Sequence, residues 1–179
     1  VLKGIIWFEK KVIDSPNNIG FGRAHNLALK DCKSDIHLVL NPDAIMQKES
    51  LTIGCKYLKE QSGAAMVTPF AEHPSGKRVY LCKRYPSILD LFLRGPAPGW
   101  LKKMADKRLE RYECRDFNDC KVTRGVDIAS GCYMLAKTDA LKKVSGFNEV
   151  YFLYFEDFDL SLRISRVGTI DYLPEMRIL

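Results

Sequence analysis

Three acidic residues late in the chain have the types and spacing best suited to chemistry. Glu156, Asp157 and Asp159 lie between an aromatic, apolar segment, residues 151–155, and the start of an expected helix. A carboxylate beside aromatic rings can act as a general base toward a sugar hydroxyl, because a sugar ring can stack on such rings. The same acids can instead cap the helix and complement its dipole, and the local pattern favours that alternative at least equally.

The helix that would position these acids is predicted from its periodicity. Apolar and polar residues between Leu160 and Val167 fit a short amphipathic helix that begins near Phe158. Asp159 and Arg163 have the i,i+4 spacing of an ion pair. The aromatic residues at 151–155 fit either a buried core or contact with a ligand.

Upstream of these acids, strand and helix signals alternate, which favours an α/β fold. The run at 36–40 is expected to be a central strand buried on both faces, so Asp43 follows a carboxyl end, where open α/β sheets bind ligands. Gly146 is expected to end a helix. The other expected strands are 11–14, 64–68, 126–130, 131–136 and 168–173, and the expected helices are 24–30, 50–61 and 138–144.

Composition indicates one domain. The chain has 179 residues, of which 46% are hydrophobic and 28% charged, and no apolar run reaches the ~18 residues of a membrane span. Neither end resembles a domain boundary, so we expect a fragment. The six cysteines lack a CxxC pair, which favours free thiols in the cytosol; Cys114 and Cys120 form at best half of a zinc site. His25 and His37 are expected to be structural, and Trp7 and Phe8 to pack on the core.

Residues 70–125 form an expected basic insertion with helices at 87–93 and 100–112. Lys77 to Arg115 contains eleven Lys and Arg against four Asp and Glu, so this segment has a net charge of +7. Such a patch predicts an anionic partner, which can be a membrane surface, a phosphate-bearing substrate or nucleic acid. No nucleic-acid-binding motif accompanies it, so no nucleic acid is expected. The insertion fits either a surface that lies on an anionic bilayer or a lid over an acceptor.

The motifs, taken in order, resemble a known family. The turn NIGFGRAHN, the strand exit LNPDA, the segments SGCYMLAK and SGFNE, and FLYFEDFDLSLR are together similar to glycosyltransferase family 2 with the GT-A fold, and most similar to its bacterial rhamnosyltransferase-like members. The KRYPS segment at 83–87 is also similar to this family. The resemblance covers residues 18–174.

The resemblance implies a UDP- or dTDP-sugar donor, a divalent cation (Mg²⁺ or Mn²⁺) and inversion at the anomeric carbon. It implies that Asp157 is the catalytic base with Glu156 beside it, that Asp43 binds the cation, and that Asp159 orients the acceptor or the helix. Tyr154 is expected to contact the acceptor. The residues expected to approach the donor are Asn18, Gly20, Arg23, Asn26 and Asn41, where Asn41 replaces the first acid of the family's metal-binding motif.

The resemblance also implies a single partial domain at 1–179, with a mixed sheet flanked by helices that lacks the first nucleotide-binding strands. Two functions follow. One is an inverting transferase that adds a sugar, with rhamnose a candidate, to a polysaccharide or lipid-linked acceptor at the cytoplasmic face of a membrane. The other is a truncated or degenerate domain that binds a glycan or a partner without turnover. A nucleotidyltransferase is a third possibility, but the sequence shows no Gly-rich phosphate loop of the kind expected for that enzyme class.

Overall fold

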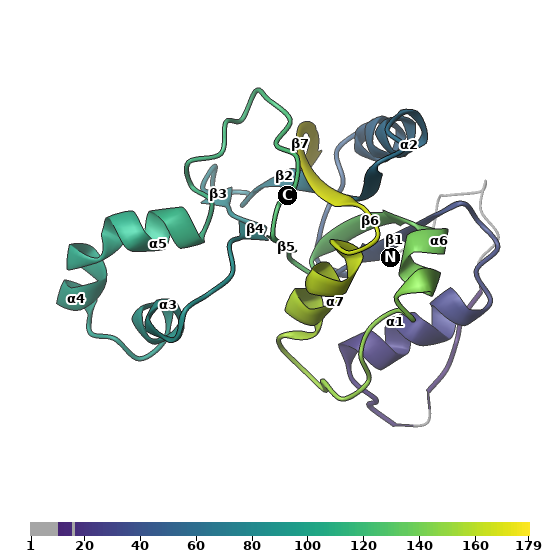
Figure 1. Ribbon diagram of the computed structural model, residues 1–179, viewed down its shortest axis with the longest axis horizontal. Coiled ribbons are helices and arrows are strands. Elements are labelled where there is room, and N and C mark those ends of the chain that lie inside the picture. Colours follow the sequence, from purple (N-terminus) through teal and green to yellow (C-terminus); the bar gives the residue numbers. More distant parts are fainter. Residues whose placement is uncertain (1–10, 16) are drawn as a thin grey trace.

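A five-stranded mixed sheet forms the centre of the fold in the computed structural model, which describes residues 11–15 and 17–179 (Figure 1). The antiparallel partners are β1 (Ile36–Leu40) with β6 (Tyr133–Lys137), and β6 with β2 (Ala64–Glu72). The long strand β7 (Thr169–Ile178) runs parallel to β2, and the short β3 (Arg78–Val79) pairs with the end of β2. The expectation of a mixed sheet is therefore confirmed.

Helices cover both faces of this sheet. Side chains alternate along β6, so Met134 and Ala136 face one core cluster while Tyr133 and Leu135 face the other. The first cluster is closed by α1 (Phe21–Lys30), α6 (Thr138–Lys143) and α7 (Glu156–Ile164), and the second by α2 (Ser50–Glu60). The start of α7 thus lies on the same face of the sheet as α1.

Three short helices form a separate lobe beside the sheet (Figure 1). They are α3 (Ile88–Arg94), α4 (Gly99–Met104) and α5 (Asp106–Tyr112), which share a small core of Leu93, Ala97 and Leu109. The pair β4 (Cys82–Lys83) and β5 (Ile128–Ala129) connects the lobe to the rest of the fold. In the described residues no helix has both the length and the apolar character needed to cross a bilayer.

The lobe differs in two ways from its sequence prediction. The helix expected at 100–112 is two helices that meet at Ala105, and the lobe begins later than residue 70 because β2 continues to Glu72 and pairs with β3. The helix α3 begins with a capping box in which the Ser87 hydroxyl and the Asp90 carboxylate bond reciprocally to backbone N–H groups. Arg108 of α5 donates to Asp90 at 2.6 Å, which joins the two helices.

Two strand predictions are wrong. Residues 11–14 are exposed and form no strand, because they have no described strand to pair with. The strand at 36–40 exists as β1, but it is not central: among the described strands it pairs only with β6, and only Val39 is fully buried, at 2% exposure. Trp7, Phe8 and Pro16 lie outside the described residues.

The remaining elements match their predictions within a few residues, apart from β7, which extends past the expected end at 173 to Ile178. Gly146 ends α6 with a left-handed φ of 65° and an N–H bond to Leu141, as expected. One boundary matters for function: α7 begins at Glu156 and not near Phe158. The three acids therefore belong to the first turn of the helix.

Candidate functional site

A strained turn precedes α7. Tyr154 and Phe155 both have left-handed backbone angles, with φ of 68° and 67°, which side-chain-bearing residues rarely adopt. Such angles persist only where surrounding structure imposes them, and they concentrate at functional sites. Tyr154 is 72% exposed in this turn, so it does not belong to a buried core, which was one of the two alternatives for the aromatic segment. Glu156 and Asp157 follow the turn directly.

Backbone N–H groups fix the carboxylate of Asp157. Its Oδ2 atom accepts from Gly131 at 3.1 Å, and its Oδ1 atom accepts from Phe158 at 2.9 Å. Burial raises the pKa of Asp157, and these hydrogen bonds and the charge of Arg94 partly offset that rise. A positioned carboxylate with increased proton affinity suits the role of a general base.

Glu156 lies beside Asp157 and has 8% exposure. Its Oε2 atom is buried without a hydrogen-bond partner among the described residues. Burial, with a smaller effect from the charge of Asp157, raises the pKa of Glu156. An unpartnered buried carboxyl oxygen is costly, so it is a candidate for ligand contact.

The LNPD segment is attached to the turn that holds Asp157. The Asn41 N–H donates to the carbonyl of Cys132 at 3.0 Å, and Cys132 directly follows Gly131. Burial and then the charge of Asp43 raise the pKa of the Cys132 thiol. The structure therefore attaches the predicted base to Gly131 and the predicted cation-binding segment to Cys132, which are adjacent residues of one turn.

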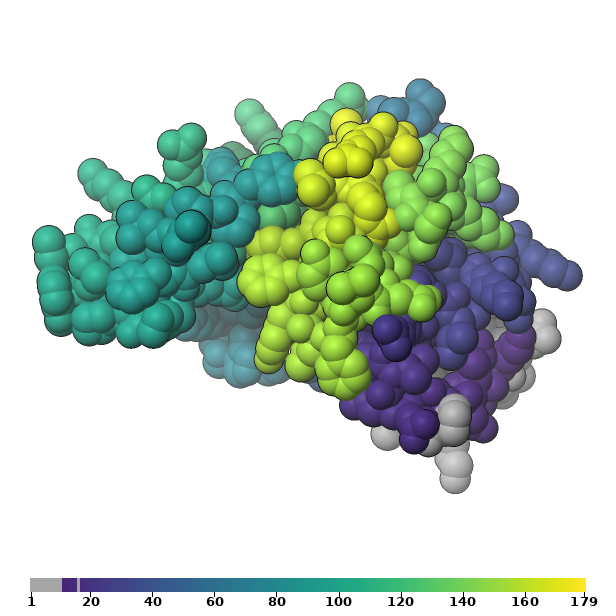
Figure 2. Space-filling view, turned by 60° about the horizontal axis from the view of Figure 1, so that its bottom comes forward, coloured from purple at the N-terminus to yellow at the C-terminus, as the bar shows by residue number. Residues whose placement is uncertain are grey.

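The acids open into a cavity of about 640 Å³ between α7 and the lobe. The segment that contains Glu156 and Asp157 lies between the lobe and α1 on the molecular surface (Figure 2). The 154–158 segment contributes three aromatic rings and both acids, Ser130 and Cys132 come from the turn before β6, and the side toward the lobe contributes apolar residues as well as polar ones. The lining residues are Val79, Tyr80, Leu81, Lys83, Leu91, Arg94, Tyr112, Ile128, Ser130, Cys132, Tyr154, Phe155, Glu156, Asp157 and Phe158.

The predicted donor-side residues gather at the start of α1. The Asn18 side chain accepts the Gly20 N–H at 3.0 Å, and Arg23 donates to the carbonyl of Glu149 at 2.9 Å. The Asn26 amide binds both the N–H and the carbonyl of Phe147, at 2.8 and 2.9 Å. These bonds tie α1 to the loop that leads to α7. Contact of any of these residues with a donor stays a prediction.

Close packing explains the glycine in this turn. Gly20 has a φ of 87°, and a Cβ atom there would lie 2.5 Å from the carbonyl oxygen of Phe152. Gly131 also approaches α1, since a Cβ atom on it would lie 3.2 Å from the ring of Phe21. The turn before α1 therefore contacts both the 151–155 segment and the turn that holds Asp157.

Asp159 pairs within its own helix. Arg163 donates to its Oδ2 atom at 2.6 Å and also donates to the carbonyl of Gly146 at 2.7 Å, which joins α7 to the end of α6. The expected i,i+4 ion pair is thus confirmed. Asp159 does not line the cavity. This geometry supports the alternative in which Asp159 orients the helix, and contact with an acceptor stays a prediction.

His25 and His37 occupy structural environments. The His25 ring packs against Phe21 and Phe147, with centroids 4.5 and 5.9 Å apart. Burial, with a smaller contribution from His37, lowers the pKa of His25 to about 4, so this imidazole is neutral at pH 7. Burial also lowers the pKa of His37.

A cation would have one protein carboxylate at the predicted position. Asp43 is exposed, and the described residues contain no group of three or more His, Cys, Asp or Glu side chains that could bind a metal. A single carboxylate fits Mg²⁺ or Mn²⁺ when substrate phosphates and water supply the other oxygens. Cys114 is buried while Cys120 is exposed, and neither belongs to a group of three or more potential zinc ligands within the described part of the chain.

Sequence reasoning missed three residues of the cavity. Lys83, Arg94 and Tyr112 come from the basic segment, for which an anionic partner was expected but no place in this cavity. Lys83 opens the KRYPS segment, and that motif was the available signal. Arg94 and Tyr112 end their helices, and nothing local in the sequence places them near Asp157.

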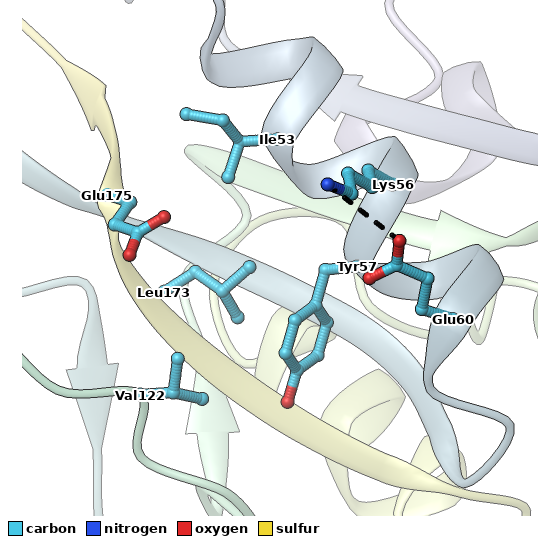
Figure 3. Close-up of a pocket in the computed structure, with 7 residues that line it drawn as sticks. All are labelled: Ile53, Lys56, Tyr57, Glu60, Val122, Leu173 and Glu175. Carbon is cyan, nitrogen blue, oxygen red and sulfur yellow. Dashed lines mark ion pairs between the residues drawn. The ribbon is translucent and has the colours of Figure 1, made fainter.

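A second, smaller cavity of about 270 Å³ lies on the opposite face of the sheet (Figure 3). Ile53 and Tyr57 of α2 face Leu173 of β7 across it, and Lys56 pairs with Glu60 at 3.9 Å on its rim. The Tyr57 hydroxyl donates to Asp171 at 2.9 Å. None of the predicted site residues lines this cavity, so we assign the chemistry to the cavity that Glu156 and Asp157 line.

Comparison with protein families decides the family. The model described as glycosyltransferase like family 2 matches residues 9–177. The chain belongs to this glycosyltransferase family. The match includes every site residue considered above.

Two curated relatives of this glycosyltransferase chain carry rhamnosyltransferase names. The rhamnosyltransferase WbbL of Escherichia coli K12 is 27% identical over 87% of the chain. The N-acetylglucosaminyl-diphospho-decaprenol L-rhamnosyltransferase of Mycobacterium tuberculosis is 24% identical over 94% of the chain. The alignments span 58% of the length of each relative.

The crystal structure of S. aureus TarS 1–349 resembles this glycosyltransferase chain in fold. The TM-score is 0.53 at 15% sequence identity, and the match covers 90% of the chain and 40% of the TarS structure. At this identity the likeness shows a shared fold only.

Proposed function

We propose that the chain forms part of the catalytic domain of an inverting glycosyltransferase. The observation that carries the proposal is the turn at 131–132, which holds Asp157 through Gly131 and the LNPD segment through Cys132. A donor beside Asp43 and an acceptor in the cavity would then meet at Asp157. The mixed sheet, together with the motifs, supports a GT-A arrangement.

In the proposed reaction, an acceptor hydroxyl attacks the anomeric carbon of the donor sugar. A bond forms between the hydroxyl oxygen and the anomeric carbon, while the bond from that carbon to the diphosphate oxygen breaks. The hydroxyl proton moves to the Asp157 carboxylate, and the bonding electron pair leaves with the nucleoside diphosphate. One displacement from the opposite side inverts the configuration. A positioned base contributes typically ~10²–10⁴ in rate.

The donor is proposed to be a UDP- or dTDP-sugar on the α1 side of the site. Asp43 would bind a divalent cation that, when present, offsets charge on the diphosphate. Members of this family often use such cations. Asn18, Gly20 and Asn41 lie on the segments that would approach the nucleotide, while Arg23 and Asn26 fix the loop that precedes α7.

The sugar is proposed to be rhamnose and the acceptor a lipid-linked or polysaccharide glycan, on the strength of the two relatives' names. Tyr154 and Phe155 line the cavity next to Asp157 and offer rings on which an acceptor sugar can stack. Because Glu156 lines the same cavity and has an unpartnered buried oxygen, it is proposed to contact an acceptor hydroxyl.

The lobe is proposed to contact the cytoplasmic face of a membrane. Ile88, Phe92, Trp100 and Met104 are exposed on its helices, at 89%, 44%, 66% and 78%. Lysines interleave with them, and an amphipathic basic surface of this kind suits an anionic bilayer. Such contact would place a lipid-linked acceptor beside the cavity.

A ligand screen on the full-length protein tests the function. UDP- and dTDP-sugars with and without Mn²⁺ are scored by thermal shift, and the stabilising donor is then assayed for transfer to a polyprenyl-diphosphate glycan and to a soluble glycan. The proposal predicts cation-dependent stabilisation and an inverted product. Stabilisation by glycan alone, with no transfer from any donor, would instead support the domain that binds a glycan without turnover.

A further inference from the structure

Two basic side chains, Lys83 of β4 and Arg94 of α3, line the same cavity as Glu156 and Asp157. Lys83 is 8% exposed and lines the cavity that contains Glu156 and Asp157. Its ammonium group donates to the carbonyl of Tyr80. In the described part of the chain Lys83 forms no ion pair, although a buried ammonium group is costly without one.

The surroundings of Lys83 leave it with excess positive charge. The charge of Glu113 partly compensates it, but Arg115 binds Glu113 at 2.7 Å and Arg94 approaches the same carboxylate at 3.9 Å. Burial lowers the pKa of Lys83, and an anion in the cavity would reverse that effect.

Two further groups face the same space. Arg94 lines the cavity, and its side chain is half exposed, so its guanidinium can reach a ligand. The Tyr112 hydroxyl is buried with no hydrogen-bond partner among the described residues, and Tyr112 also lines the cavity. A cation, a guanidinium and an unpartnered hydroxyl around one space match the oxygens of a phosphate group.

Two other arginines nearby, Arg84 and Arg108, are already paired with carboxylates. Arg84 forms a bidentate pair with Asp116 at 2.8 and 3.0 Å, and Arg108 binds Asp90 at 2.6 Å. Their positive charge therefore serves the folding of the lobe. Lys83 and Arg94 differ because the cavity gives them room for an external anion.

We propose that Lys83, Arg94 and the Tyr112 hydroxyl form a subsite for the phosphate group of a phosphate-linked acceptor. The inference rests on the proposed function and narrows its acceptor class. Arg94 and Tyr112 of the lobe line the cavity together with Asp157, and the predicted cation-binding segment is attached to the 131–132 turn through Cys132. An acceptor phosphate on the lobe would leave the acceptor sugar between Tyr154 and Asp157.

Binding experiments on the full-length protein test the subsite without turnover. The probes are farnesyl diphosphate, farnesol and inorganic pyrophosphate, measured by titration calorimetry. The wild-type protein is expected to bind farnesyl diphosphate and to bind farnesol much more weakly. Lys83→Met should weaken farnesyl diphosphate binding by roughly tenfold or more, because a charge-assisted hydrogen bond is lost. Lys83→Arg should retain most of the affinity, and Arg94→Gln and Tyr112→Phe should each reduce it.

Lys137→Met is the matched control. Lys137 also donates its ammonium protons to backbone carbonyls, those of Gln61 at 3.0 Å and Ser62 at 3.2 Å, but it lies away from the cavity. This variant should keep wild-type affinity for farnesyl diphosphate. Unfolding midpoints of all variants show whether a loss of binding reflects a loss of folding.

Two results would overturn the subsite. One is unchanged farnesyl diphosphate affinity in folded Lys83→Met and Arg94→Gln. The other is an equal loss of nucleotide-sugar affinity, which would assign these residues to the donor diphosphate. If pyrophosphate binds as tightly as farnesyl diphosphate, the subsite recognises free phosphate and has no preference for a lipid-linked phosphate. A wild-type protein without transferase activity would contradict the proposed function while these titrations still decide the subsite.

Discussion

The Gly131 N–H donates to the Oδ2 atom of Asp157 over 3.1 Å, and this bond joins the helix that carries the predicted base to the turn between β5 and β6. The next residue of that turn, Cys132, accepts a bond from Asn41 of the predicted cation-binding segment. Two residues of one turn thus set the relative position of the two acids that the proposed reaction needs.

Gly20→Ala tests whether the start of α1 supports this arrangement. Its φ of 87° disfavours alanine, and the new Cβ atom would lie 2.5 Å from the Phe152 carbonyl oxygen. We expect the free energy of unfolding to fall by roughly 1–3 kcal/mol in a urea titration. Gly63→Ala is the control, because a Cβ atom there meets nothing within 4 Å. Equal stability of the two variants would show that the contact with Phe152 is unimportant.

The raised pKa of Asp157 predicts the pH dependence of transfer. The base must be ionised, so kcat/KM should fall as the pH drops through this pKa, which lies above the ordinary aspartate value because of burial. The charge of Arg94 lowers the pKa of Asp157. Arg94→Gln should therefore move the acid limb of the profile to higher pH, whatever its effect on acceptor affinity. An unchanged acid limb in the pH profile of Arg94→Gln would show that the charge of Arg94 does not act on the titrating group.

The exposed apolar and basic residues of the lobe predict membrane binding by the full-length protein. Flotation with anionic vesicles at low salt should retain the protein, and high salt should release it, because salt screens the attraction. Trp100→Ser, at a 66% exposed position, should reduce retention, whereas Leu51→Ser on the distant helix α2 should not. Absence of lipid-dependent, salt-sensitive binding would leave the lobe as an acceptor lid.

Sequence patterns predicted most of the sheet and helices, because hydrophobic periodicity reflects burial directly. These predictions failed where the formation or position of a strand depends on which other strand pairs with it. Residues 11–14 have strand-forming side chains but no described strand beside them, and β1 is apolar enough for a central strand although only β6 pairs with it. The position of α7 was two residues off, because left-handed angles at Tyr154 and Phe155 start the helix where propensity predicts none.

The acids of the site were predictable because they lie in short motifs. The places of Lys83, Arg94 and Tyr112 in the cavity were not, since these residues are far apart in sequence and meet only through the packing of the lobe. Likewise, the amide of Asn26 and the guanidinium of Arg23 bind the backbone at 147–149, and no local pattern reveals such long-range bonds.

Asp43→Ala should weaken cation-dependent donor binding. The exposed carboxylate is the predicted protein ligand of Mg²⁺ or Mn²⁺, which would bridge it to the donor diphosphate. In titration calorimetry with the preferred donor, the affinity gained on adding Mn²⁺ should largely disappear. Asp139→Ala, in α6 and away from the site, should behave as the wild type. A normal response to Mn²⁺ in Asp43→Ala would remove this acid from the cation site.

The most direct measurement compares transfer and donor binding in full-length Asp157→Asn. The amide keeps the size of the carboxylate, and its one oxygen can still accept the Gly131 N–H while the bond from the Phe158 N–H is lost, but it cannot take the acceptor proton. The account predicts a loss of kcat by roughly 10²-fold or more, with donor affinity and the unfolding midpoint close to those of the wild type. Near-wild-type turnover by a folded Asp157→Asn protein would contradict the account, because the base would then lie elsewhere.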